Sequence, residues 1–416
     1  MSEPEVVNPV PVEAIEPWMR TLRTALLHDP GAPDALTRLH NRRRTWTPER
    51  TWGVRHDDRW VGTLATEART LTVPGSPDVV AVDALTAVSV AATHRRRGFL
   101  RGMLGRSLAA AAERGDALSV LIAAEWPIYG RFGYAPATQS ARYRYHPRRP
   151  GALPRGGDAH RIRAVTADEV GEIGPVVFDR ARRRDAGQMD RDGAWWPRSL
   201  GLGGFELQGE RQHWFVHDGD DGAPDGLLAW RPTRSLDLDG TPGAVAVQLL
   251  AAATDAAYLN LWTYLAGIDL VGEITLDERP VDEPVRWLLG DGRALQETGT
   301  VDELWVRLLD VPAALTARGY AADGRIVLDV RDEDTGGYAA GRFALDVAGG
   351  VARCEPTADG ADLLVAQRAL ASAYLGGHRL RRLAVAAGVE ERTPGALDRA
   401  DLMFSTPVAP WNQTHF

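Results

Sequence analysis

Apolar residues recur at helical spacing and in strand-like runs along the first part of the chain. The helical spacing predicts three helices, over 12–28, 33–44 (starting at Pro33) and 99–114. Alternating and β-branched runs predict strands over 51–73 (a pair around an Asp57–Asp58 turn), 79–91 and 117–125. The order of strand, turn, helix and strand across 79–125 is a βαβ unit, so its two strands are expected to be parallel neighbours.

A stretch dense in Pro, Gly and Arg at 146–158 is predicted to be a linker. After it the order of elements repeats. The pattern predicts a strand and a helix capped at Thr166 over 161–183, a strand pair in "HWFVHD" and "DGLLAWRP", and a strand followed by a helix over 244–268. This echo of the first part indicates a duplicated domain, but one without an arginine–glycine turn.

A third segment begins near Thr298. It contains the strand patterns "GRIVLDV", "RFALDV" and "VARCEP", a turn at Gly349–Gly350 and two helical patterns within 361–388, which together predict an α+β module. The last residues, "STPVAPWNQTHF", include Trp411 and Phe416, whose apolar rings favour burial. The predicted fold class is therefore α/β with α+β, with domains over 1–150, 151–297 and 298–416.

Composition narrows the function. The 416 residues are 44% hydrophobic and 25% charged, without a long apolar run or a basic leader, so a cytoplasmic protein that is not in a membrane is expected. The net charge of −8 argues against nucleic acid as a partner. Cys354 is the only cysteine and the histidines lack ligand spacing, so no disulfide and no metal are expected. The sequence contains no lysine.

The stretch "AVSVAATHRRRGFLRGML" at 87–104 carries the clearest chemistry. A strand enters a basic, glycine-containing turn that opens directly onto a helix. Free backbone N–H groups and the positive end of the helix dipole then converge on one spot, and arginines can add charge-assisted contacts to phosphates. This predicts an anion site. The alternative is a solvated run of charges at the start of a helix.

That stretch, followed by "IYGRFGYAPAT" and by a chain ending in Phe, resembles the Eis (enhanced intracellular survival) family within the GNAT acetyltransferase superfamily. The segment from "ELWVRLLDVPAALTARGY" onward is similar to the sterol-carrier-protein-like domain of that family. The resemblance implies tandem GNAT domains, the first catalytic and the second degenerate, then the sterol-carrier-like domain, assembled as a homohexamer.

The resemblance also implies acetyl-CoA as co-substrate. Its acetyl and pantetheine part would meet Val88, Ser89 and Val90, and Ala124 and Glu125 would line the far side. The pyrophosphate loop would consist of Arg96, Arg97, Gly98, Phe99, Leu100 and Arg101. Of these contacts, only the phosphate loop follows from the residue chemistry itself.

Two groups are implied for proton transfer. Tyr129 of the "IYG" element would be the proton donor, and the C-terminal carboxylate of Phe416 would be the proton acceptor, whereas Tyr134 is better interpreted as packing. The alternative for Phe416 is a chain end that merely docks. The implied acceptor is a primary amine of a small polyamine or aminoglycoside-like molecule, although His415 stands where an acidic residue would help to hold several ammonium groups. Transfer to a protein or peptide lysine, and a non-catalytic protein that binds acyl-CoA or lipid, are the alternatives.

Overall fold

Three β-sheets contain most of the strands of the computed structural model, which describes residues 5–416 except 208, 238, 334–335 and 387. Contacts divide the chain into two compact units. The first unit holds Met1–Ala137, Leu304–Pro407 and His415–Phe416, and the second holds Thr138–Glu303 and Val408–Thr414. The mixed parallel and antiparallel sheets with their connecting helices confirm the predicted α/β and α+β class.

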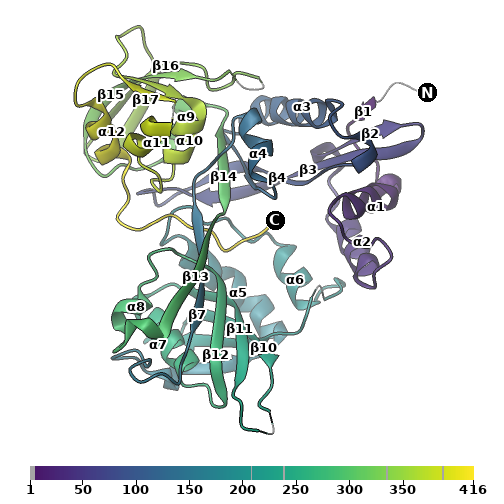
Figure 1. Cartoon of the computed structure of the whole chain (residues 1–416), viewed down its shortest axis with the longest axis vertical. Helices are drawn as coiled ribbons and strands as arrows, with labels where there is room; N and C mark the ends of the chain where they lie inside the picture. The colour runs from purple at the N-terminus through teal and green to yellow at the C-terminus, as the bar shows by residue number, and fades with distance from the viewer. Residues whose placement is uncertain (1–4, 208, 238, 334–335, 387) are drawn as a thin grey trace. The chain divides into compact units, whose positions relative to one another are not determined.

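The first sheet lies in the first unit and has the strand order β1-β2-β3-β4-β5-β14-β6 (Figure 1). Its strands are β1 (Glu5–Val7), β2 (Thr51–His56), β3 (Arg59–Thr72), β4 (Val79–Val90), β5 (Leu118–Ile122), β14 (Leu304–Leu308) and β6 (Ala135–Pro136). β4 and β5 are parallel, as predicted, and α3 (Phe99–Glu113) lies between them in the chain. β2 and β3 form the predicted hairpin, with Asp57 and Asp58 both at positive φ.

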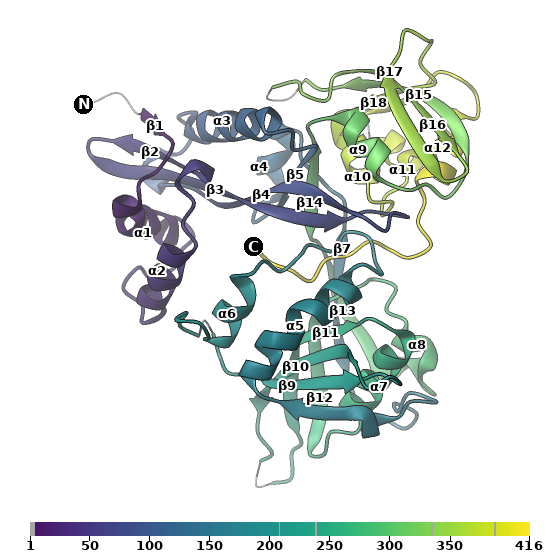
Figure 2. The same ribbon diagram turned by 180° about the vertical axis from the view of Figure 1, so that it is seen from behind.

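Helices cover both faces of this sheet (Figures 1 and 2). Leu64 packs in the cluster that α3 covers, and its neighbour Ala65 packs with Trp18 of α1 (Ile15–Ala25). Successive residues of a strand face opposite sides, so the two helices lie on opposite faces. The other short elements here are α2 (Asp34–Arg44), α4 (Trp126–Tyr129), η1 (Val12–Ala14), η2 (Pro48–Arg50), η3 (Ala92–His94) and η4 (Gly130–Phe132). Pro33 is the N-cap of α2 and not its first residue.

The second unit has its own seven-stranded sheet, in the order β13-β7-β12-β11-β10-β9-β8. The strands are β13 (Leu295–Asp302), β7 (Gln139–Tyr145), β12 (Val271–Arg279), β11 (Gly243–Ala252), β10 (Pro224–Arg234), β9 (His213–Asp218) and β8 (Ile162–Val165). The helices are α5 (Ala167–Arg182), α6 (Trp195–Leu200), α7 (Asp255–Ala266) and α8 (Val285–Leu288), with η5 (Ala159–Arg161) and η6 (Gly292–Ala294). The predicted cap at Thr166 is a full capping box with Glu169.

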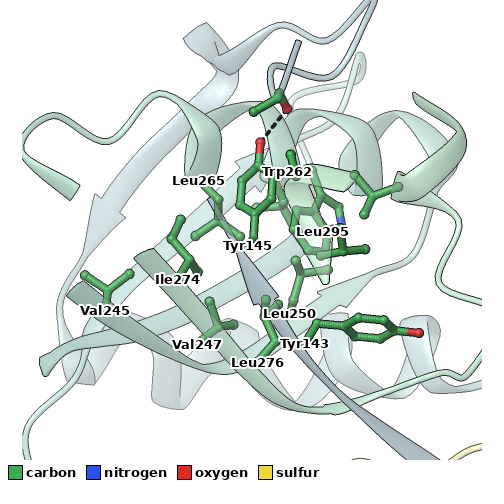
Figure 3. Close-up of a cluster of buried hydrophobic side chains, with 14 of the residues drawn as sticks. Tyr143, Tyr145, Val245, Val247, Leu250, Trp262, Leu265, Ile274, Leu276 and Leu295 are labelled. Atoms are coloured by element: carbon green, nitrogen blue, oxygen red, sulfur yellow. Dashed lines mark hydrogen bonds between the residues drawn. The ribbon is translucent and has the colours of Figure 1, made fainter. Parts of the chain in front are cut away.

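Aromatic packing fixes the core of this second sheet (Figure 3). The rings of Tyr145 and Trp262 meet edge to face, with centroids 5.6 Å apart. The Tyr145 hydroxyl donates a hydrogen bond to the backbone oxygen of Ala152, so this buried polar group is satisfied.

The third sheet returns to the first unit and has the order β17-β16-β15-β18-β19 (Figure 2). The strands are β17 (Val351–Pro356), β16 (Gly341–Ala348), β15 (Gly324–Arg331), β18 (Leu363–Ala366) and β19 (Val389–Glu391), and the helices are α9 (Val311–Ala317), α10 (Gln367–Ala373), α11 (Leu380–Ala386) and α12 (Ala396–Phe404). Buried Arg318 donates to the carbonyl oxygens of Tyr374 (2.5 Å) and Phe404 (3.0 Å). It thereby caps the ends of α10 and α12, where the helix dipoles favour a cation.

Two strands, β13 and β14, join sheets that are formed mainly by other parts of the chain. The predicted third segment includes the residues of β14, yet β14 pairs with β5 of the first sheet, with Val306 opposite Val120. β13, from the same stretch, pairs with β7 in the second sheet. All five residues of β14 are buried, which suits an interior strand, but such a run does not say which sheet it joins. The domain boundaries at 150 and 297 stay predictions. Within the described ranges, no helix has the length and apolar character needed to cross a membrane.

Candidate active site

β4 and β5 run side by side for three residue pairs and then separate. The last pair is Ala84 opposite Val120, and no further pairing between these two strands occurs in the described part of the chain. β4 remains bonded to β3 on its other edge as far as Val90. Ala87 has a φ of 54°, and the β3–β4 register shifts next to it, which marks a bulge. The backbone of Val88–Val90 is thus paired with β3 on one edge and has no pairing with β5 on the other, within the described residues.

The arginine–glycine turn follows directly. Gly98 is the N-cap of α3 with a φ of 82°, a conformation that glycine adopts without strain. The cap has no side-chain hydrogen bond, and the first intrahelical bond runs from Gly102 N to Gly98 O. Arg96 and Arg97 are exposed beside it. Uncapped N–H groups beside exposed arginine side chains at a helix start are an arrangement that favours an anion.

The opposite end of α3 is tied to the sheet by a buried carboxylate. Asp83 of β4 lies 2.7 Å from a guanidinium nitrogen of Arg114, the C-cap of α3, and 2.8 Å from one of Arg50. Burial raises the pKa of the Asp83 carboxyl to about 6, although both arginines oppose this rise. This clamp fixes the C-terminal end of α3 against β4.

Tyr129 and Tyr134 have different surroundings although their rings touch edge to face. The Tyr134 hydroxyl is hydrogen-bonded to Ser119 Oγ at 2.7 Å, and Ser119 donates to the Asp83 carbonyl. The Tyr129 hydroxyl makes no hydrogen bond to any residue that the structure describes. Burial first, and the charge of Glu125 second, raise the pKa of Tyr129 to about 12. Tyr129 therefore stays protonated, and its hydroxyl is able to donate a hydrogen bond.

The end of the chain belongs to the first unit. Thr86 Oγ1 donates a hydrogen bond of 3.1 Å to a terminal oxygen of Phe416. Thr86 lies on β4 two positions beyond Ala84, the last residue paired with β5. The terminal carboxylate is therefore bound to the strand at the point where the strands separate.

A buried ion pair holds the turn that follows Tyr129. Arg307 of β14 donates to the carbonyl oxygen of Phe132 and lies 3.3 Å from the carboxylate of Asp332, which follows β15. Both side chains are fully buried. A side chain at Gly133 would collide with the Arg307 guanidinium, and the φ of 82° there also favours glycine. Arg307 thus connects the tyrosine turn to the third sheet.

Three stretches of the chain match known protein families. Residues 7–137 and 187–308 match family models described as acetyltransferase (GNAT) domain, and 311–413 match the sterol carrier protein domain. An uncharacterized N-acetyltransferase of Streptomyces avermitilis is 36% identical over 99% of both chains. N-acetyltransferase Eis of Mycobacterium tuberculosis is 35% identical over 81% of both chains.

The chain belongs to the Eis-like family of GNAT N-acetyltransferases. The crystal structure of Eis1 from Mycobacterium abscessus is similar over the full length of both chains, with 31% identity and a TM-score of 0.86. The predicted tandem GNAT domains and sterol-carrier-like domain are confirmed. An N-acetyltransferase of this class implies acetyl-CoA as the acetyl source. The uncapped start of α3, the exposed arginines and the open edge of β4 fit that molecule.

In the described part of the second GNAT domain of this Eis-like chain, the corresponding helix start is capped. Its β11 leads into α7, whose first turn is capped by the Thr254 hydroxyl accepting from Ala257 N at 3.0 Å. Asp255 adds a negative charge to the same turn. With its N–H group used and an acid beside it, this helix start does not attract a phosphate. Across the described residues, no group of three or more His, Cys, Asp or Glu could hold a metal ion.

The predicted site residues lie on consecutive elements of the first sheet. Val88–Val90 end β4, Arg96–Arg101 form the turn and the start of α3, Ala124 and Glu125 follow β5, and Tyr129 ends α4. Their roles stay predictions. Sequence reasoning missed Thr86, Ser119 and Arg307, because nothing in their local pattern indicates partners far along the chain.

Proposed function

We propose that the chain transfers the acetyl group of acetyl-CoA to a primary amine of a small polyamine or aminoglycoside-like acceptor, by direct transfer in a ternary complex. The observation that carries this proposal is the hydrogen bond from Thr86 to the terminal carboxylate of Phe416. The hydrogen bond holds the proposed base, the Phe416 carboxylate, on β4. The same strand leads into the arginine–glycine turn before α3. A purely carrier protein has no need of that arrangement.

The cofactor contacts are proposed from the same elements. N–H groups at the start of α3 and the side chains of Arg96, Arg97 and Arg101 would bind the pyrophosphate. The free edge of β4 at Val88, Ser89 and Val90 would bond the pantetheine amides as a neighbouring strand does. Phe99 and Leu100 supply backbone N–H groups to the loop, and Ala124 and Glu125 line the side that follows β5.

The chemistry requires two proton movements. The Phe416 carboxylate would accept a proton from the acceptor amine as the N–C bond forms, and the Tyr129 hydroxyl would donate a hydrogen bond to the sulfur as the C–S bond breaks. With a pKa near 12, Tyr129 lies roughly 3 to 4 pKa units above an ordinary thiol. Tyr129 therefore stabilises the thiolate as a hydrogen-bond donor, and solvent supplies the proton that finally leaves with the thiol.

The charge of the acceptor is a separate part of the proposal. The net charge of −8 favours a cationic acceptor. His415, exposed beside Phe416, supplies no carboxylate for additional ammonium groups. We therefore expect acceptors with few ammonium groups to be better substrates than heavily charged aminoglycosides.

A cytoplasmic location and a homohexamer complete the proposal, and light scattering of the purified protein tests the hexamer.

One assay tests the function. Acetyl-CoA is mixed with the protein and a panel containing putrescine, spermidine, several aminoglycosides and a lysine peptide, and free thiol and product mass are measured. Since the chain has no lysine, none of its own side chains can accept acetyl on an amine, so the background should be low. We expect thiol release with a mono-acetylated small amine. Thiol release with the lysine peptide alone would show that the acceptor is a protein lysine and not a small amine. No thiol release with any amine would refute the proposal.

A further inference from the structure

The C-terminal segment before Phe416 is buried although it forms no helix or strand. Residues 410–414 are all buried, and Val408–Thr414 belong to the second unit by their contacts. We call residues 409–414 the tail anchor. Chain ends are usually loose unless they are tied down, so the bonds that hold this one are informative.

Trp411 makes three hydrogen bonds and one cation–π contact with the second unit. Its backbone N–H donates to Ala186 O (3.1 Å), its indole N–H donates to Asp185 (3.0 Å), and its carbonyl accepts from Gln188 Nε2 (2.9 Å). The guanidinium of Arg279 lies 5.0 Å from the centre of its ring. The side chain is 5% exposed.

Asn412 and Thr414 are joined to the backbone of Met189. The Met189 N–H donates to Asn412 Oδ1 at 3.1 Å, and the Thr414 hydroxyl donates to Met189 O at 3.2 Å. Asn412 also bonds the backbone of Thr414 in both directions. Both side chains are completely buried, so each of these bonds is shielded from water.

An arginine in an aromatic cage binds the next carbonyl. The Arg191 guanidinium lies 3.8 Å from the ring centre of Trp195 and 4.3 Å from that of Phe178. Its Nη2 donates to Gln413 O at 3.2 Å. The rings fix the direction of the guanidinium, so the arginine is preorganised for a peptide carbonyl.

The tail anchor also reaches the place where β11 and β12 separate, which corresponds to the separation of β4 and β5 in the first sheet. β11 and β12 pair in parallel up to Val247 opposite Leu276, as β4 and β5 do up to Ala84. Beyond that point a cavity of about 80 Å³ remains, and Gln413 lines it. Arg279 closes the gap by donating to Leu250 O at 3.0 Å. A space of this size admits a few water molecules and no cofactor.

We infer that the second GNAT domain is a peptide receptor for the tail anchor of its own chain, with Asn412, Trp411 and Arg191 as positioning residues for the terminal carboxylate. His415 and Phe416 join the tail anchor to the Phe416 carboxylate, so the tether between them is two residues long. The role of the carboxylate rests on the proposed function, whereas the receptor does not.

The first test uses the full chain. Asn412→Ala removes the bonds to Met189 and Thr414, and we expect kcat to fall at least tenfold while the KM for acetyl-CoA changes less than twofold. Val408→Ala is the matched control, because Val408 is 44% exposed and precedes the tail anchor. An unchanged kcat in a folded Asn412→Ala protein would overturn the positioning role.

The second test supplies the tail as a peptide. A chain ending at Pro407 is mixed with a labelled peptide of residues 408–416, made once with a free carboxylate and once as the C-terminal amide, and binding and turnover are measured. We expect both peptides to bind within threefold of each other, a Trp411→Ala peptide to bind at least tenfold more weakly, and only the free carboxylate to restore turnover. Restoration by the amide would refute the carboxylate base and leave the receptor standing. Failure of both peptides to bind a truncated chain that still binds acetyl-CoA would refute the receptor, and if the truncated chain does not fold, the full-chain test decides.

Discussion

Thr86 and Phe416 are separated by 330 residues, yet the hydroxyl of the first donates a 3.1 Å hydrogen bond to the terminal carboxylate of the second. The carboxylate is thereby fixed on β4 near the open end of the strand. A base has to be held at hydrogen-bonding distance from the amine that it deprotonates, so the proposed role of the Phe416 carboxylate depends directly on this bond.

Replacing Thr86 by valine keeps the shape of the side chain and removes the donor. A hydrogen bond to a charged group contributes about 1.5–3 kcal/mol, so we expect kcat to fall roughly tenfold or more, with little change in the KM for acetyl-CoA. Steady-state kinetics at saturating amine measure this effect. Thr86→Ser keeps the hydroxyl and should recover most of the loss, whereas equal damage from serine and valine would point to packing instead.

Extending the chain by one glycine after Phe416 tests the carboxylate itself. The extension moves the charged group by about 3.5 Å and places an uncharged peptide where it was. We expect turnover to fall by at least about 100-fold, since a base displaced by this distance no longer meets the amine. The same glycine added at the N-terminus is the control. Full activity in the C-terminally extended protein would exclude Phe416 as the base.

The two tyrosines give opposite predictions. Tyr129→Phe removes a hydroxyl that bonds no described residue, so stability should be retained while turnover falls by about 100-fold or more. Tyr134→Phe breaks the bond to Ser119, which should cost about 1 kcal/mol of unfolding free energy and leave turnover nearly unchanged. Urea unfolding and thiol release measure the pair. If Tyr134→Phe lost the activity instead, the assignment of the donor would have to be reversed.

The pH dependence follows from the burial of Tyr129. Because the pKa is raised to about 12, the neutral donor persists throughout the alkaline range. We expect a plot of kcat against pH with no falling limb below about pH 11 due to this group. The same shift favours the folded state below about pH 10, and this contribution disappears as the pH rises through the pKa in the fold. A limb near pH 10 that vanishes in Tyr129→Phe would show that the phenol is not buried in solution.

Local patterns predicted the parts of the fold whose partners are near in sequence. The hairpin at Asp57–Asp58, the capping box at Thr166 and the parallel pairing of β4 with β5 across α3 all follow from spacing within a few dozen residues. The strand, the arginine–glycine turn and the helix start at 87–104 were predictable for the same reason, since they occur in one continuous stretch.

The remainder depends on contacts between distant residues. β14 has the pattern of a buried strand, but nothing in "LWVRL" selects β5 as its neighbour, because hydrophobic pairing carries little information about the partner. Apolar rings predicted that Trp411 would be buried, yet its partners Asp185, Ala186 and Gln188 lie far earlier in the chain, and no local pattern selects them. The bond of Thr86 to the chain end is equally hidden, since one threonine in a strand resembles any other.

The buried pair of Arg307 and Asp332 gives the last prediction. Both side chains are fully buried, and Arg307 also holds the carbonyl of Phe132 in the turn after Tyr129. Arg307→Met leaves the Asp332 carboxylate without this cation, which typically costs about 3–5 kcal/mol, so the midpoint of urea unfolding should fall sharply. Adding Asp332→Leu removes the stranded charge and should recover much of the stability, but not the turnover, because the bond to Phe132 is still missing. Recovery of turnover together with stability would mean that the pair serves only folding and does not position the tyrosine turn.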